Sequence, residues 1–203
     1  VAEGLLLDAS AARTASDSRP PVASLFVGLS YLFGGASARV GARSEGERKE
    51  IEGFVSRPMP AGSGAGFQVG GAYGATPRVQ ALGEGQIDVG RARAWFTQTG
   101  DQRSADLEIS GAIVAVEGGG VFFTRPVQQG FAVVEVPGAA GVRGYLNNQE
   151  VGRTDADGLM VVPDLLPYYG NRLSMNDADL PMDYAVSATE RVIAPPLRGG
   201  AAR

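Results

Sequence analysis

The feature that most constrains this chain is a period-two alternation of side-chain polarity through roughly its first 125 residues. Between residues 104 and 110, for example, polar residues occupy the even positions and apolar residues the odd ones. A period of two places successive side chains on opposite faces of a sheet, so strands are expected rather than helices. The runs predict strands near residues 3–13, 23–33, 36–46, 49–58, 66–76, 78–90, 91–99, 102–116 and 120–125.

The segments between these runs carry turn-forming residues. They are Gly34-Gly35, Pro58 to Gly64, Thr76-Pro77, Gly100-Asp101 and Gly118 to Gly120. Glycine, proline and aspartate favour tight turns, and connections this short join antiparallel neighbours. An antiparallel meander is therefore predicted, with no room for helical crossovers.

The alternation fits both a membrane barrel and a soluble sandwich, because each buries one face of every strand. Several runs approach the roughly 9–11 residues that a tilted strand needs to cross a bilayer, and no apolar run approaches the roughly 20 residues of a spanning helix. Aromatic residues toward the strand ends resemble the girdles of a barrel. The aromatics expected on the apolar face are Phe26, Tyr31, Phe33, Phe54, Phe67, Tyr73, Trp95, Phe96, Phe122 and Phe123.

Composition excludes several functions. The 203 residues include no Cys and no His, which removes disulfide scaffolds, thiol nucleophiles, histidine metal sites and Ser-His-Asp catalysis. The net charge of -4 gives no reason to expect nucleic acid as a partner. No catalytic residue, metal, cofactor or small-molecule substrate is predicted, and an enzyme is the third-ranked interpretation.

The texture changes after Pro126. Prolines punctuate short apolar runs there, at positions 126, 137, 163, 167, 181, 195 and 196. Proline cannot donate to a sheet ladder and is poorly tolerated in a central membrane strand. Two domains are therefore expected, a barrel segment at 1–125 and a small soluble β-domain at 126–203. The chain starts at Val1 without an initiator Met or signal peptide, so an N-terminal part is expected to be missing.

A family resemblance rests on residues 125–200. Its elements, in order, are Phe131 to Pro137, Gly141-Val142, Gly152 to Asp155 with Gly158, Val162-Pro163, Leu166 to Tyr168, Asn171-Arg172, Leu180-Pro181, Arg191-Val192 and Arg198-Gly199. This order resembles the junction between the barrel and the C-terminal domain of fimbrial outer-membrane ushers. The stretch from Tyr145 to Val151 is more similar to ushers of spore-coat-protein-U-type secretion systems.

The resemblance implies an all-β chain: an antiparallel transmembrane β-barrel segment followed by a small periplasmic β-sandwich-like domain. It also implies an outer-membrane location, contact with outer-membrane lipid, and chaperone–pilus subunit complexes from the periplasm as partners. Ushers of this kind carry N-terminal, plug and final C-terminal domains that this chain lacks. The alternatives from other classes are a complete small outer-membrane barrel and a soluble β-sandwich adhesin.

Two sets of candidate site residues follow. The residues expected to line a barrel lumen, with a solvated sheet surface as the alternative, are Arg39, Arg43, Gln68, Gln80, Glu84, Gln86, Asp88, Arg91, Arg93, Asp106 and Glu108. The residues that form either a partner-binding patch or domain core are Tyr145, Leu165, Tyr168 and Tyr169. Acidic segments at 155–158 and 176–179 lack the spacing of a calcium loop, and the glycines at 62–66 precede a predicted strand, unlike a phosphate loop.

Overall fold

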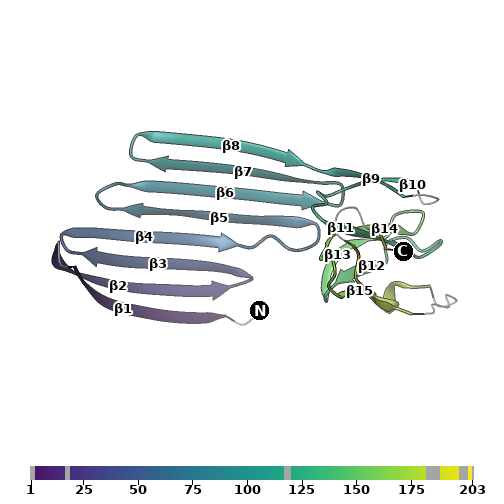
Figure 1. Cartoon of the computed structure of the whole chain (residues 1–203), viewed down its shortest axis with the longest axis horizontal. Helices are drawn as coiled ribbons and strands as arrows, with labels where there is room; N and C mark the ends of the chain where they lie inside the picture. Colours follow the sequence, from purple (N-terminus) through teal and green to yellow (C-terminus); the bar gives the residue numbers. More distant parts are fainter. Residues whose placement is uncertain (1–2, 17–18, 117–119, 182–187, 197–200, 203) are drawn as a thin grey trace. The chain divides into compact units, whose positions relative to one another are not determined.

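The structure is a computed structural model that describes residues 3–16, 19–116, 120–181, 188–196 and 201–202. These residues form β-strands, with one short 3₁₀ turn at Asp177–Asp179 (Figure 1). Among the described residues, no helix is long and apolar enough to cross a bilayer. The predicted all-β fold class is confirmed.

Contacts between residues divide the chain into two compact units. The first comprises Val1–Met59, Ala65–Glu84 and Arg93–Glu108, and the second comprises Pro60–Gly64, Gly85–Ala92 and Ile109–Arg203. A boundary at residues 125 and 126 follows the sequence alone, whereas the contacts group the strands just before Arg125 with those after it.

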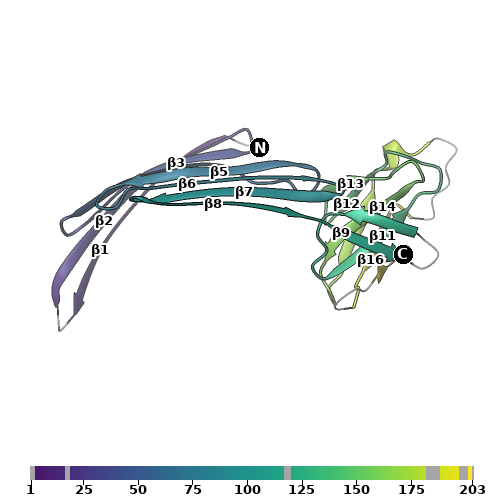
Figure 2. The same ribbon diagram turned by 90° about the horizontal axis from the view of Figure 1, so that it is seen from above.

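The first eight strands form one antiparallel layer in chain order, seen face-on in Figure 1 and from above in Figure 2. They are β1 (Gly4–Ser16), β2 (Arg19–Phe33), β3 (Ala36–Glu45), β4 (Arg48–Arg57), β5 (Gly64–Tyr73), β6 (Arg78–Ile87), β7 (Gly90–Thr99) and β8 (Gln102–Ser110). Gly34 and Gly35 join β2 to β3 with φ angles of 51° and 78°. Positive φ at both central residues is the hairpin geometry that matches strand twist, and glycine adopts it without a steric cost.

One predicted strand is wrong. The run at 102–116 ends as β8 at Ser110 and resumes as β9 (Ala112–Val116), which pairs with β10 (Gly120–Thr124) in a separate two-stranded sheet. A Cβ on Gly111 would lie 3.1 Å from the Val89 carbonyl oxygen and 3.4 Å from that of Thr124. The backbone therefore changes partners where only glycine leaves space. Of the predicted turn at Gly118 to Gly120, the first two glycines lie outside the described residues.

The remaining strands of the second unit form two sheets. One has the order β14-β11-β17 and the other the order β13-β12-β15-β16. Their bounds are β11 (Gly130–Glu135), β12 (Arg143–Leu146), β13 (Gln149–Arg153), β14 (Leu159–Leu165), β15 (Asn171–Met175), β16 (Glu190–Ile193) and β17 (Ala201–Ala202).

A hydrophobic cluster joins these two sheets. Ala132, Met160 and Val162 from β11 and β14 are buried in one cluster with Val151 of β13, and Leu165 at the end of β14 is 0% exposed. Leu146, Leu173 and Ile193 from the other strands pack against the same cluster. Burial of this kind contributes about 1.5–3 kcal/mol per large aliphatic side chain.

The opposite face of β11 and β14 has a second cluster. Phe131 and Val133 of β11 are buried there with Val114 of β9, and Phe122 of β10 packs against them. The β9–β10 hairpin therefore shares its core with the second unit. This packing explains why contacts assign both strands to that unit rather than to the large sheet.

Candidate functional site

The large sheet presents two faces of opposite character. In an antiparallel pair, residues directly opposite each other project to the same side. One such row, from β1 to β4, contains Leu7, Leu29, Val40 and Gly53, and the adjacent row contains Asp8, Gly28, Gly41 and Glu52. The alternation repeats along the sheet, so we call the side of Asp8 the polar face and the side of Leu7 the apolar face.

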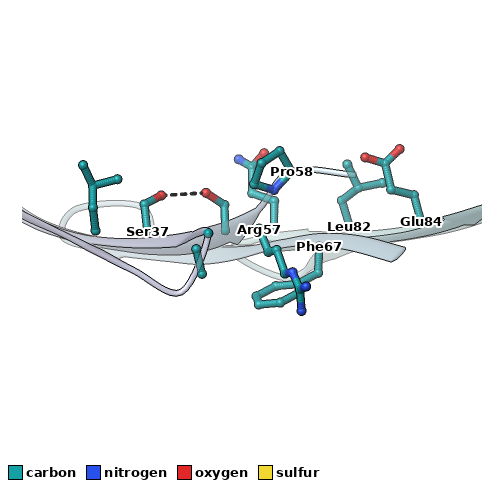
Figure 3. Close-up of a pocket in the computed structure, with 11 residues that line it drawn as sticks. Ser37, Arg57, Pro58, Phe67, Leu82 and Glu84 are labelled. Carbon is teal, nitrogen blue, oxygen red and sulfur yellow. Dashed lines mark hydrogen bonds between the residues drawn. The ribbon is translucent and has the colours of Figure 1, made fainter. Parts of the chain in front are cut away.

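Figure 3 shows the same alternation around a shallow groove at one end of the first unit. The Phe67 ring points to the opposite side of the sheet from Leu82 and Glu84. On the polar face, the hydroxyls of Ser37 and Ser56 are hydrogen-bonded at 3.0 Å. Small polar side chains thus continue the polar face to the strand ends.

Most of the predicted lining residues share the polar face. The register puts Arg39 and Arg43 on the side of Asp8, and Gln68 lies opposite Ser56 on that side. Gln80 and Glu84 alternate along β6 with Val79, which lies beside Gly71 of the apolar face. Arg93 bonds to Glu84, while Asp106 and Glu108 alternate along β8 with exposed Leu107 and Ile109.

Ion pairs link the charged side chains of this face. Arg39 of β3 lies 3.2 Å from Asp8 of β1, and Arg78 of β6 donates to both carboxylate oxygens of Glu50 at 2.9 and 2.8 Å. Arg93 of β7 contacts Glu84 of β6 at 3.3 Å. Exposed pairs stabilise a fold weakly. Their main consequence here is that cationic and anionic groups neutralise each other along the polar face.

Phe26 lies on the polar face, which corrects its predicted position. Its register partner is Arg43, and the guanidinium carbons of Arg39 and Arg43 lie 5.2 and 5.7 Å from its ring centroid. The ring covers Gly28 and Gly41, where an added Cβ would lie 2.9 and 2.8 Å from ring atoms. Two glycines on adjacent strands therefore provide the space in which an aromatic ring supports two cations.

Phe54 repeats this arrangement on β4 and was likewise predicted on the wrong face. It lies opposite Arg39 and Gly70, and a Cβ on Gly70 would overlap its ring. Aromatic rings that cover glycines on a neighbouring strand stabilise register in curved sheets.

The apolar face is open to the surroundings in this structure. Leu7 is 69% exposed, Val40 50% and Ile51 59%. Contiguous exposed aliphatic surface is rare on soluble monomers and marks a surface that contacts other molecules.

Three predicted lining residues belong to the second unit instead. Gln86 is 4% exposed and donates to the carbonyl oxygens of Pro60, Ala61 and Gly62, so it does not line an open face. Arg91 donates to Gln86 Oε1 at 2.9 Å, and the Asp88 carboxylate accepts a hydrogen bond from Ser63.

The predicted partner-binding residues separate by burial. Tyr168 and Tyr169 are 73% and 71% exposed, and Tyr145 is half-buried. Leu165 is fully buried in the core, so it presents no surface to a partner.

Asn171, which the sequence did not single out, organises the loop that carries the two exposed tyrosines. It is 1% exposed, accepts from the Leu166 N–H at 2.9 Å, and donates to the carbonyls of Leu166, Tyr169 and Ile193. Tyr168 has a φ of 60°, and its N–H donates to the Pro195 carbonyl at 2.9 Å. A buried side chain therefore holds the loop in a conformation that is uncommon for a bulky residue.

The acidic segments serve local structure. Asp155 accepts from the N–H groups of Asp157 and Leu159, both at 2.9 Å, as an Asx turn does. Asp179 accepts from Arg143 Nε at 2.7 Å and Nη2 at 2.8 Å, and these hydrogen bonds hold the pKa of its carboxyl below the ordinary value. Within the described segments, no group of three or more Asp, Glu, His or Cys side chains could hold a metal ion. The glycines at 62–66 lead into β5 rather than into a helix.

Comparison with known proteins gives the same direction as the fold. The family model described as Outer membrane usher protein matches residues 66–201. YehB, an outer membrane usher protein of Escherichia coli K12, is 33% identical over 104 residues, which cover 51% of this chain and 12% of that protein. HifC, an outer membrane usher protein of Haemophilus influenzae, is 32% identical over 108 residues, covering 53% of this chain and 12% of that protein.

The fold is also similar to a solved structure. A chain of the cryo-EM structure of the E. coli P pilus tip assembly intermediate PapC-PapD-PapK-PapG superposes with a TM-score of 0.63 at 18% identity. The superposition covers 98% of this chain and 25% of that one. This chain thus spans about an eighth of the length of the curated relatives it matches.

An all-β chain with one aliphatic and one polar sheet face, matched over two thirds of its length by this model, belongs to the outer membrane usher protein family. The family membership does not favour a complete small barrel or a soluble adhesin.

Proposed function

We propose that this chain is part of a non-enzymatic outer-membrane usher that assembles chaperone-delivered pilus subunits and passes them across the outer membrane. The observation that carries the proposal is the opposite polarity of the two faces of one eight-stranded sheet. A protein that spans lipid with strands needs an apolar outer face, and a pore for a folded protein needs a polar inner face.

In this proposal the polar face lines the lumen of a barrel. Arg39, Arg43, Gln68, Gln80, Glu84 and Arg93, with Asp106 and Glu108 of β8, would face water. The Asp8–Arg39, Glu50–Arg78 and Glu84–Arg93 pairs support this role, since neutralised charges attract a passing subunit less than a wall of one sign does.

The apolar face would contact outer-membrane lipid, which accounts for the exposure of Leu7, Val40 and Ile51. Within the described sheet, β1 and β8 each have a neighbouring strand on one side. Lipid offers no hydrogen bonds to the free side of such a strand. Pairing with further strands of a longer chain, such as the curated relatives have, would close both edges.

The second unit would be a periplasmic β-sandwich-like domain that receives chaperone–subunit complexes. Tyr168 and Tyr169, with half-buried Tyr145, are its candidate contact residues, because exposed aromatic side chains anchor protein interfaces. The similar solved structure is an assembly intermediate of PapC with PapD, PapK and PapG, and the partners proposed for this chain are suggested by analogy with that complex.

The test uses the full-length parent protein with an epitope tag inserted after Arg203. Outer-membrane fractionation, heat-modifiable migration on gels, and protection of the tag from protease added to intact cells are the expected results. A soluble product without heat-modifiable migration would contradict the proposal.

A further inference from the structure

A buried polar cluster connects four segments of the second unit. Arg125 follows β10, Gln86 lies near the end of β6, residues 60–64 belong to the loop before β5, and Val151 lies on β13. Arg125 is 5% exposed and Gln86 is 4% exposed. Two polar side chains this deeply buried need hydrogen-bond partners, because an unpaired buried polar group is costly.

The loop carbonyls supply those partners. Gln86 Nε2 lies 2.8, 3.0 and 2.6 Å from the carbonyl oxygens of Pro60, Ala61 and Gly62. Arg125 Nη1 donates to the Ala61 carbonyl as well. Outside this inner cluster, the Ser63 hydroxyl donates to the Asp88 carboxylate at 2.7 Å. The loop at 60–64 is thus held by side chains rather than by strand pairing.

The same arginine also reaches the outer edge of a sheet. β13 is an end strand of the β13-β12-β15-β16 sheet, and its Val151 carbonyl accepts from Arg125 Nη2 at 2.6 Å. Gly62 lies so close to this strand that a Cβ there would be 2.8 Å from the Glu150 carbonyl oxygen. The loop and Arg125 therefore cover the backbone of β13 at the edge where another strand would pair.

The chemistry of Arg125 makes this closure conditional. In the described chain its hydrogen-bond acceptors are backbone carbonyls, and its buried Nε has no hydrogen-bond partner. A buried guanidinium is stabilised only while its acceptors stay in place, so losing the loop would leave an uncompensated buried charge. The loop, the arginine and the β13 edge are therefore expected to open together.

We infer that Arg125, Gln86 and the loop at 60–64 form a clasp that blocks the outer edge of β13 against addition of an extended strand from another polypeptide. An open sheet edge presents unpaired N–H and C=O groups that recruit such strands. The inference concerns the second unit alone and does not depend on the proposed translocation function.

The test compares two arginine substitutions in the full-length protein. Arg125→Met removes the charge and both donors but keeps an unbranched side chain that fills much of the same space. Arg153→Met is the matched control, because Arg153 also lies on β13 but is 57% exposed at its side chain and pairs with Glu150. Hydrogen exchange is measured by mass spectrometry on peptides covering 60–64, 149–153 and the β11 and β14 core.

Arg125→Met should speed exchange at 60–64 and 149–153 at least tenfold while leaving the β11 and β14 peptides unchanged. Arg153→Met should leave all four unchanged. An equal increase throughout the second unit would show that Arg125 only stabilises the fold, and no increase would show that the clasp does not exist. If Arg125→Met fails to reach the membrane, Ser63→Ala removes one outer bond of the loop and should speed exchange at the same two segments.

Strand addition is tested with a biotinylated synthetic peptide of the sequence of residues 142–148, which contains the strand that β13 already pairs with on its inner side. Arg125→Met protein should retain this peptide at least fivefold more than the parent or Arg153→Met protein. The same peptide with proline at the position of Gly144 should not be retained, because it lacks a backbone donor. Equal retention by parent and variant would overturn the inference.

Discussion

Substituting Leu165 by alanine tests whether this residue is core or contact surface. Leu165 is 0% exposed and packs with Val151, Met160 and Val162. The substitution removes three carbon atoms, which costs about 2–2.5 kcal/mol in transfer free energy at about 0.8 kcal/mol per methylene. Incomplete collapse of the cavity adds to this, so the expected loss of unfolding free energy for the second unit is about 3–4 kcal/mol.

The assay is pulse proteolysis of the full-length protein in detergent across a urea series, followed through a tag after residue 203. With a urea dependence of roughly 1–1.5 kcal/mol per molar, the midpoint should fall by roughly 2–3 M. Leu166→Ala is the matched control, since Leu166 is 54% exposed and its truncation should move the midpoint by less than about 0.5 M. Equal, small shifts for both variants would refute the core assignment of Leu165.

Three further predictions follow from the packing and the charges. Asn171→Ala should destabilise the second unit by about 2–3 kcal/mol in the same urea assay, because buried carbonyls lose their donor. Gly28→Val should displace the Phe26 ring and lower the heat-modifiable fraction of the protein, and adding Phe26→Ala should restore part of it. Since Arg143 lowers the pKa of Asp179, the pair's stabilisation is present at neutral pH and lost as the pH falls below about 4. The urea midpoint should therefore fall less between pH 6 and pH 3 in Asp179→Asn protein than in the parent.

Strand positions in the first unit followed from local sequence because the determining signals are local. The predicted strand at 36–46 is observed as Ala36–Glu45, and the turn at Gly34-Gly35 has the positive φ angles that such a hairpin needs. Period-two polarity and turn residues depend on a few neighbouring positions, so a single sequence contains them.

The break at Gly111 and the face of Phe26 depended on residues distant in sequence. The alternation gave no sign of a break at Gly111, but β9 leaves the large sheet because β10 offers it a partner. Phe26 is apolar and was predicted on the apolar face, yet two glycines and two arginines on the polar face accommodate its ring. Tertiary packing overrides residue type in such places.

The candidate sites were predicted best where exposure follows simple alternation. Arg39, Arg43 and Gln68 do share one face, and Tyr168 and Tyr169 are exposed. Gln86 was predicted as a lining residue, and Leu165 as either contact surface or core, because their local patterns resemble those of exposed neighbours. Their burial results from a loop and from a second sheet that the sequence pattern alone does not bring near them.

The central claim is that the two faces of the large sheet meet water and lipid, and neighbouring residues of β5 test it most directly. Gln68→Cys and Val69→Cys project to opposite faces, both at exposed positions, and the chain has no other cysteine. In a full-length protein without other reactive cysteines, embedded in the outer membrane, a charged water-soluble maleimide should label Gln68→Cys. Val69→Cys should react with a lipid-soluble maleimide only. Equal labelling of both positions by the water-soluble reagent would contradict the account.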